Sequence, residues 1–297
     1  MLEKGVINKM RVTLLGTGLM GSAMARRLCA EGANVTVWNR TAQRAEALRE
    51  YGITPCRSAV EAVVAAEVVL LTLSNADAIE SMLASEGMTE AVRGRLLVQM
   101  GTIAPEESRA LAAKIKTLGA AFIEAPVLGS IPEALKGTLL IMTGGDEAVV
   151  ERALPVLEML GKQPRHIGAV GQAAALKLAL NQLIASLTAA FSLSLGLVRR
   201  EGVDVKTFMD VLRKSALYAP TFDKKLAREI EWNFSNPNFP LKHLLKDVDL
   251  FRQVAAADGL DDRPLEGIRA AIAAGIAAGF GELDYSVLYA VIDPQSR

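Results

Sequence analysis

The chain has 297 residues, of which 51% are hydrophobic and 22% are charged. This composition is typical of a folded globular protein and excludes a disordered or fibrous one. Basic and acidic residues number 33 each, so no net field attracts nucleic acid or an anionic membrane surface. At roughly 100–200 residues per domain, the length favours two domains. We therefore expect a soluble protein that binds a small molecule through a local site.

Cysteine usage points to a reducing compartment. The two cysteines, Cys29 and Cys56, lie far apart, and no His or Cys stands at metal-ligand spacing from either. We therefore expect a cytoplasmic protein with no metal site. The segment Met1–Met10 has no apolar run of signal-peptide length, so export is not expected.

The first half of the chain has the pattern of a largely parallel sheet. Short aliphatic runs alternate with stretches of helical period, and they lack the polar alternation of half-exposed strands. Pro105, followed by two glutamates, marks a helix start, which places Gly101 and Thr102 in the turn after a strand. The predicted strands are Arg11–Leu15, Val35–Trp38, Val68–Leu73, Leu96–Met100, Ala121–Glu124 and Leu139–Thr143.

The second half is predicted to be all-helical. Long Ala/Leu-rich segments at helical spacing follow Gln172, with no convincing strand alternation. The segment Leu178–Val198 carries no charge and is about as long as a membrane span, but Asn, Gln, Ser and Thr interrupt it. We interpret Ala173–Val198 as a buried helix that leaves the first domain and becomes the spine of the second. The expected fold is a Rossmann-type, doubly wound α/β domain (residues 1–170) followed by an all-α substrate and dimerisation domain (171–297).

A glycine motif follows the first predicted strand. Gly16 permits a tight turn, Gly18 lets the backbone approach a pyrophosphate, and Gly21 lets helix and strand pack closely. A second strand ends at Trp38, within the roughly 30-residue unit expected of a dinucleotide-binding motif. A tight strand-to-helix turn without a ligand is the alternative. We also count Leu19, Met20, Leu73, Ser74 and Thr102 among the cofactor-binding residues.

The residues after the second strand indicate which dinucleotide binds. Where NAD-binding proteins usually carry an acid for the ribose hydroxyls, this chain has Asn39, Arg40 and Thr41. A guanidinium can grip a 2′-phosphate through two hydrogen bonds, and no carboxylate is present to repel it. The sequence therefore predicts NADPH as the preferred cofactor. The alternative is that Arg40 is a solvated residue at a helix start.

Lys177 is the only charged residue between Ala173 and Val198, on the most apolar predicted helix. Asn181 lies four residues on and therefore on the same face. A desolvated lysine has a lowered pKa and can protonate the oxygen that becomes negative during hydride transfer to a carbonyl. The sequence thus favours Lys177 as an acid or base. Snorkelling of Lys177 to solvent is the alternative.

These residues resemble the β-hydroxyacid dehydrogenase family, and most closely its glyoxylate and succinic semialdehyde reductase branch. Four motifs carry the resemblance, in the family's order and over nearly the whole chain. They are the glycine signature Gly16–Met24, the substrate loop Glu124–Ser130, the catalytic segment Gly168–Asn181 and the stretch Phe239–Asp247.

The resemblance implies a role for most of the candidate residues. Lys177 would be the general acid, with Asn181 orienting the substrate. Thr102, near the cofactor, and the backbone of Gly129 would hold the substrate carboxylate. The substrate set also includes Leu128, Ser130 and Phe239, and Lys246 and Asp247 would close on the cofactor. An ordinary salt-bridging helix face is the alternative for that pair, and a core residue is the alternative for Phe239.

The chain departs from the family at two positions near the substrate. The family commonly has Ser where this chain has Leu128, and Ser before the threonine where it has Gly101. Each departure removes a hydroxyl, and a lost hydrogen bond to a charged group costs about 1.5–3 kcal/mol. Ser130 is a candidate to compensate.

The leading function is reduction of glyoxylate or succinic semialdehyde to the hydroxyacid, with hydride from NADPH and a proton from Lys177. Oxidative 3-hydroxyisobutyrate dehydrogenase, with Lys177 as base, is the first alternative. Imine reductase and a non-catalytic nucleotide-binding module come after it, because relatives of both kinds usually lack the lysine. The resemblance also implies a homodimer or homotetramer formed through the helical domain.

Overall fold

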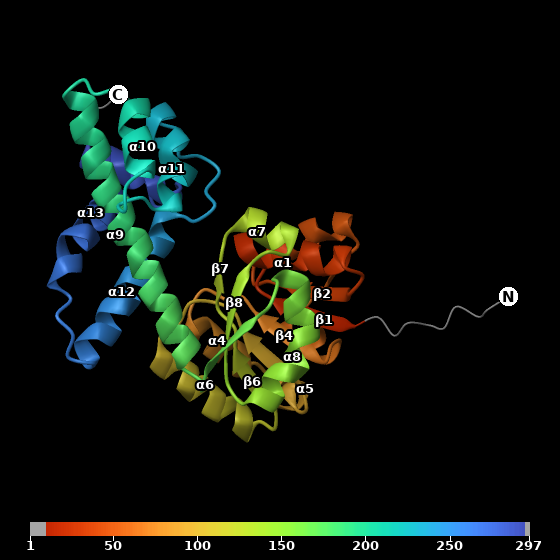
Figure 1. Ribbon diagram of the computed structural model, residues 1–297. Helices are drawn as coiled ribbons and strands as arrows, with labels where there is room; N and C mark the ends of the chain where they lie inside the picture. The colour runs from red at the N-terminus through yellow and green to blue at the C-terminus, as the bar shows by residue number, and fades with distance from the viewer. Residues whose placement is uncertain (1–9, 295–297) are drawn as a thin grey trace. The chain divides into compact units, whose positions relative to one another are not determined.

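The computed structural model describes residues 10–294. The chain divides into two compact units, residues 1–177 and 178–297, and the division falls within helix α9 (Gln172–Arg200), drawn in green in Figure 1. The boundary expected from the sequence, at residue 170, stays a prediction.

The first unit contains a single mixed sheet. Its strand order is β3-β2-β1-β4-β5-β6-β8-β7, with β9 beside β8. The strands from β3 to β6 pair in parallel, β8 is antiparallel to β6 and β7, and β9 is parallel to β8. The strands are β1 (Arg11–Leu15), β2 (Asn34–Trp38), β3 (Thr54–Pro55), β4 (Val68–Leu71), β5 (Leu96–Gln99), β6 (Ala121–Glu124), β7 (Val127–Leu128), β8 (Leu140–Gly144) and β9 (Arg165–Gly168).

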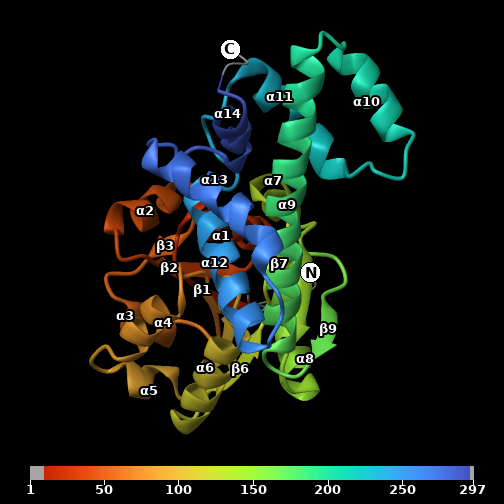
Figure 2. The ribbon, with the colours of Figure 1, turned by 90° about the vertical axis from the view of Figure 1, so that its left-hand side faces the viewer.

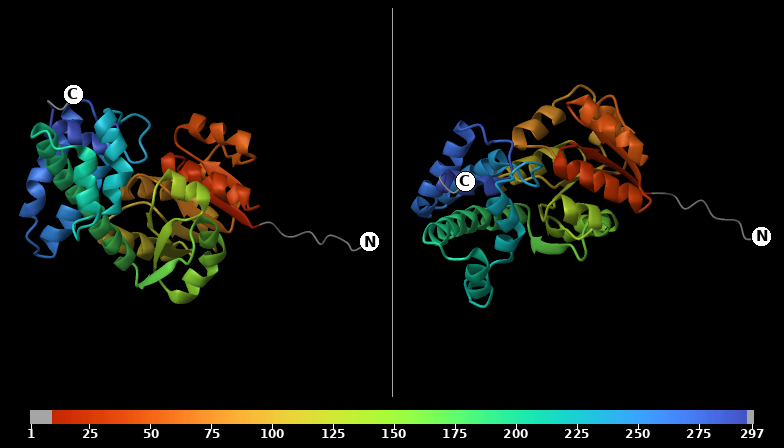
Figure 3. Two further views of the ribbon diagram at one scale, coloured as in Figure 1. Left: turned by 45° about the horizontal axis from the view of Figure 1, so that its top comes forward. Right: turned by 90° about the horizontal axis from the view of Figure 1, so that it is seen from above.

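Helices cover both faces of this sheet (Figures 1 and 3), which explains the unbroken aliphatic runs. Leu14 and Leu70 belong to the core on the face covered by α1, α7 and α8, while Leu15 and Leu71 belong to the core on the opposite face. The helices are α1 (Leu19–Ala30), α2 (Ala42–Glu46), the 3-10 helix η1 (Ala47–Tyr51), α3 (Ala59–Val64), α4 (Ala76–Leu83), α5 (Met88–Val92), α6 (Pro105–Thr117), α7 (Ile131–Lys136) and α8 (Glu147–Leu160).

The six predicted strands are confirmed to within two residues at each end, as are the helix start at Pro105 and the largely parallel sheet. Strands β3, β7 and β9 were not predicted. Strands β3 and β7 have only two residues each, and β9, with the sequence RHIG, is half to fully exposed. None of the three carries the apolar run by which a buried strand is recognised.

The second unit is helical throughout its described part, apart from one isolated bridge between Pro240 and Asp284. Its core joins Ala185 and Ala189 of α9 to Leu244 and Val248 of α12. Figure 2 shows α12 and α13 alongside α9. After α9 come α10 (Val205–Arg213), α11 (Pro220–Glu231), α12 (Leu241–Ala257), η2 (Arg263–Leu265), α13 (Glu266–Ala277), η3 (Tyr285–Val287) and α14 (Leu288–Ile292).

By length and composition alone, α9 is long and apolar enough to cross a membrane. Core helices pass the same test, and α9 supplies Ala185, Phe191 and Leu195 to the buried core of the helical unit. The Phe191 ring also stacks on that of Phe222, with the centroids 4.6 Å apart. We therefore interpret α9 as the core helix that the sequence predicted.

Candidate active site

The turn from β1 to α1 accepts only glycine at two of its three motif positions. Gly16 has φ +105°, and a Cβ there would lie 2.6 Å from the carbonyl oxygen of Thr72. A Cβ on Gly21 would lie 2.1 Å from the carbonyl oxygen of Gly16. Both contacts are closer than real Cβ atoms approach, so the two glycines fix the shape of the turn.

Gly18 has a different reason to be glycine. A Cβ there would meet nothing within 4 Å, so the space beside this residue is open. Gly18 is the N-cap of α1, whose start at Leu19 and Met20 has no side-chain cap and no acid in the first turn. A helix N-terminus whose backbone N–H groups have no side-chain cap and no nearby acid attracts an anion. The turn therefore fits the pyrophosphate of a dinucleotide, with close backbone approach at Gly18.

Thr72, at the end of β4, supports this turn and was not among the predicted residues. Its hydroxyl donates to the carbonyl oxygen of Gly16 at 2.6 Å, and its N–H donates to the carbonyl oxygen of Leu15 at 2.9 Å. A threonine directly after the strand that neighbours β1 is the only sequence signal that would have indicated it.

The residues predicted to select the cofactor follow β2, next to the glycine turn. The Asn39 side chain accepts a hydrogen bond from the N–H of Thr17 at 3.0 Å and donates to the carbonyl oxygen of Thr41 at 3.0 Å. Asn39 therefore braces the turn, a role that the sequence did not suggest. Arg40 is exposed, and Thr41 is the N-cap of α2. Arg40 therefore stays the predicted contact for a 2′-phosphate at this strand end.

The loops after β4 and β5 carry Leu73, Ser74 and Thr102, and they approach each other closely. A Cβ on Gly101 would lie 2.8 Å from the carbonyl oxygen of Leu73. A serine would therefore not fit at residue 101 unless one loop moved. Gly101 thus permits the close approach of the two loops, in addition to lacking a hydroxyl.

The predicted substrate loop runs through β7 into α7. Leu128 pairs with Leu140 of β8, and Gly129 follows it. Ser130 is the N-cap of α7, and its hydroxyl donates to Glu133 Oε2 at 2.8 Å. The Ser130 hydroxyl therefore donates its hydrogen bond within the capping box of α7. This weakens the expectation that Ser130 replaces the hydroxyl of the serine that the loop lacks.

Lys177 lies in the second turn of α9 with 9% of its surface exposed. This burial favours the desolvated lysine over a snorkelling one. The start of the helix is held by Glu124, at the end of β6, whose Oε1 accepts N–H bonds from Gly171, Ala173 and Ala174 at 2.8, 2.8 and 3.2 Å. Glu124 belongs to the predicted substrate loop, but the sequence indicates no role for it.

The second unit holds the remaining predicted residues. Asn181 is 2% exposed and donates its amide N–H to Asp247 Oδ2 at 2.6 Å, while Lys246 Nζ lies 3.2 Å from Asp247 Oδ1. Phe239 is half-buried and packs edge-on against Tyr285, with the ring centroids 5.9 Å apart. Asn181, Lys246 and Asp247 are thus in one cluster, and Phe239 packs on the helical core.

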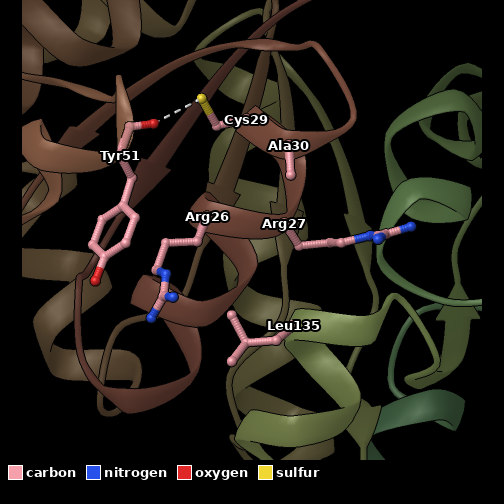
Figure 4. Close-up of a pocket in the computed structure, with 6 residues that line it drawn as sticks. All are labelled: Arg26, Arg27, Cys29, Ala30, Tyr51 and Leu135. Atoms are coloured by element: carbon pink, nitrogen blue, oxygen red, sulfur yellow. Dashed lines mark hydrogen bonds between the residues drawn. The ribbon is translucent and has the colours of Figure 1, made fainter.

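A separate surface hollow of about 470 Å³ lies at the C-terminal half of α1 (Figure 4). There the Arg26 guanidinium lies 4.1 Å from the ring centroid of Tyr51, and Cys29 Sγ lies 3.2 Å from the Tyr51 carbonyl oxygen. This is the end of α1 opposite the glycine turn, and no predicted site residue lines the hollow. Between residues 10 and 294, no group of three or more His, Cys, Asp or Glu side chains could hold a metal ion.

Comparison with known proteins adds family information to this geometry. Residues 11–171 match the family described as the NAD binding domain of 6-phosphogluconate dehydrogenase. Residues 171–292 match the family described as NAD-binding of NADP-dependent 3-hydroxyisobutyrate dehydrogenase. Glyoxylate/succinic semialdehyde reductase 1 of Arabidopsis thaliana is 32% identical over 94% of this chain and 97% of its own length.

Two solved structures extend the likeness. The Mycobacterium tuberculosis 3-hydroxyisobutyrate dehydrogenase with L-serine has a TM-score of 0.83 and 25% identity, over 95% of this chain and 98% of its own. Psf3 in complex with NADP+ and 2-OPP has a TM-score of 0.85 and 25% identity, over 95% of this chain and 99% of its own.

Proposed function

The chain belongs to the 3-hydroxyisobutyrate dehydrogenase-like family of NADP-dependent hydroxyacid dehydrogenases, which act on CH–OH groups, and we propose that it reduces a small carboxylated aldehyde or ketone with NADPH. The proposed substrates are glyoxylate and succinic semialdehyde. The identity to a reductase named for both substrates supports this choice. The exposed Arg40 beside the glycine turn supports NADPH over NADH.

The observation that carries the proposal is the burial of Lys177 near the start of α9. When bound, the nicotinamide supplies the hydride. Negative charge then grows on the carbonyl oxygen, and Lys177 donates the proton that this oxygen requires. Thr102 and the Gly129 N–H hold the substrate carboxylate, and Asn181 orients the substrate beside Lys177. The glycine turn holds the pyrophosphate, and Leu73 and Ser74 line the cofactor.

Oxidative 3-hydroxyisobutyrate dehydrogenase is the second candidate, favoured by the family description that residues 171–292 match. The same residues would serve it, with Lys177 taking the hydroxyl proton as a base. The buried Lys177 argues against an imine reductase or a non-catalytic nucleotide-binding module, because both usually lack this lysine.

The proposal extends to the compartment, the oligomeric state and the remaining site residues. The compartment is the cytoplasm, since Cys29 and Cys56 are free thiols. The helical unit mediates a homodimer or homotetramer. Lys246 and Asp247 contribute to cofactor binding, and Leu128, Ser130 and Phe239 contribute to the substrate site.

The test follows NADPH and NADH absorbance with glyoxylate, succinic semialdehyde, 3-hydroxyisobutyrate and a cyclic imine. We expect the highest kcat/KM with NADPH and one of the two aldehydes. Lys177→Ala should abolish most turnover and leave the NADPH Kd unchanged. The proposal fails if 3-hydroxyisobutyrate or the imine is the best substrate, or if Lys177→Ala keeps most of its kcat.

A further inference from the structure

Glu124 is a buried carboxylate whose two oxygens bind different elements. Glu124 is the last residue of β6, and it is 1% exposed. Oε1 accepts hydrogen bonds from three backbone N–H groups at the start of α9. Oε2 accepts a hydrogen bond from the hydroxyl of Ser108 on α6. A carboxylate at a helix N-terminus forms charge-assisted hydrogen bonds and offsets the positive end of the helix dipole.

The surrounding backbone is shaped to admit this carboxylate. A Cβ on Gly144, at the end of β8, would lie 2.5 Å from Glu124 Oε1. Any larger residue there would displace the side chain. Strands β6 and β8 pair at this point, with Glu124 opposite Gly144, so the glycine makes room where the carboxylate turns toward α9.

Each element bound to Glu124 leads directly to a residue of the proposed site. Helix α6 begins three residues after Thr102, and the chain after Glu124 continues into the substrate loop at Leu128–Ser130. Helix α9 carries Lys177 one turn beyond Ala173 and Ala174. One carboxylate therefore connects the segments that carry Thr102, Gly129 and Lys177.

We propose that Glu124 is a positioning residue, which holds these three segments so that Lys177 meets the carbonyl oxygen of a bound substrate. The inference rests on the proposed role of Lys177. Proton transfer requires heavy atoms within about 2.6–3.2 Å, and a displacement of about 1 Å can cost about 100-fold in rate. The hydrogen bonds of Glu124 fix the first turn of α9 and therefore the origin of the Lys177 side chain.

The test compares Glu124→Gln with Glu124→Ala. Glutamine keeps an acceptor for the three N–H groups and a partner for Ser108, so kcat should stay within about threefold of the wild type. Alanine leaves the N–H groups without their acceptor, and kcat should fall about 100-fold. The NADPH Kd, measured by fluorescence titration, should be unchanged in both variants, because the glycine turn is not altered.

A matched control separates positioning from stability. Asp146 caps α8 in the same unit by accepting the N–H of Val149 at 3.3 Å, and α8 carries no residue of the proposed site. Asp146→Ala should lower the Tm, as Glu124→Ala should, but it should keep the wild-type kcat. Hydrogen exchange in a peptide spanning residues 169–180 should accelerate in Glu124→Ala and stay near the wild-type rate in Glu124→Gln.

Three results would overturn the inference: an unchanged kcat in Glu124→Ala, an equal loss in Glu124→Gln, or an equal loss in Asp146→Ala. If Glu124→Ala does not fold, Ser108→Ala decides, because it removes a single bond to Oε2 and should lower kcat by about threefold to tenfold. An unchanged kcat in that variant would also overturn it. Lys177→Ala is assayed alongside. If Lys177→Ala keeps its turnover, the proposed function is wrong. If Lys177→Ala loses its turnover while Glu124→Ala turns over normally, only the role of Glu124 is refuted.

Discussion

The Asn181 amide nitrogen lies 2.6 Å from Asp247 Oδ2, and this buried hydrogen bond joins α9 to α12 in the helical unit. The bond fixes the orientation of the amide, because a carboxylate can only accept. Asn181 Oδ1 is then turned away from Asp247, and within the described residues it has no hydrogen-bond partner. A buried, oriented acceptor of this kind is suited to a polar ligand group.

We expect Asp247→Ala to destabilise the helical unit. The substitution leaves the Asn181 amide N–H buried without its acceptor, which costs about 1–3 kcal/mol. Urea unfolding monitored by tryptophan fluorescence measures the change, because Trp232 lies in this unit. The control is Asp249→Ala, which removes a partly exposed ion pair with Arg269 and should cost less than about 1 kcal/mol. Equal losses would contradict the buried hydrogen bond.

Two glycines of the first turn should respond differently to alanine. Gly21→Ala places a Cβ 2.1 Å from the Gly16 carbonyl oxygen, so the turn must open, and both the Tm and NADPH binding should fall. Gly18→Ala meets no atom within 4 Å, so its Tm should be unchanged while its NADPH Kd rises. Thermal unfolding and fluorescence titration distinguish the two effects. Normal NADPH binding by Gly18→Ala would exclude the pyrophosphate from this position.

Arg40→Ala should reduce the preference for NADPH. A hydrogen bond to a charged group contributes about 1.5–3 kcal/mol, so the NADPH/NADH ratio of kcat/KM should fall by about 10- to 100-fold. The NADH value itself should change little. Arg26→Ala serves as the control, because Arg26 stacks on Tyr51 at the other end of α1. An unchanged ratio in Arg40→Ala would leave Arg40 as a solvated residue.

Glu229 should make stability depend on pH. Burial raises the pKa of this carboxyl to about 8, from an ordinary value of 4.5, although the nearby Lys225 opposes the rise. Between these values the folded chain binds more protons than the unfolded chain, so the free energy of unfolding falls as the pH rises. At about 1.4 kcal/mol per pKa unit, the full effect on the free energy of unfolding is on the order of 5 kcal/mol.

Glu229→Gln tests this dependence, because it removes the ionisation and keeps the shape. Its stability should approach that of the wild type near pH 4 and exceed it near pH 9, as measured by urea unfolding across this range. Glu231→Gln, an exposed neighbour on the same helix, should leave the profile unchanged. Parallel pH profiles for Glu229→Gln and the wild type would show that Glu229 does not bind a proton in this interval.

Local patterns in the sequence predicted much of the fold. The aliphatic runs identified six strands, because strands covered on both faces cannot carry polar alternation. The cofactor class followed from the glycine motif, and the family followed from four motifs, one of which is the segment around Lys177. Strands β3, β7 and β9 left no such signal, since the first two have only two residues each and β9 is half to fully exposed.

The sequence by itself determined the two-part architecture, the glycine turn and the candidate lysine, because each depends on residues close together in the chain. Only the tertiary structure decided the roles of Glu124, Thr72 and Asp247. Glu124 contacts α9 some 47 residues later, and Asp247 binds an amide 66 residues earlier. A buried hydrogen bond between distant residues has no spacing rule in the sequence, because the fold alone sets which groups meet.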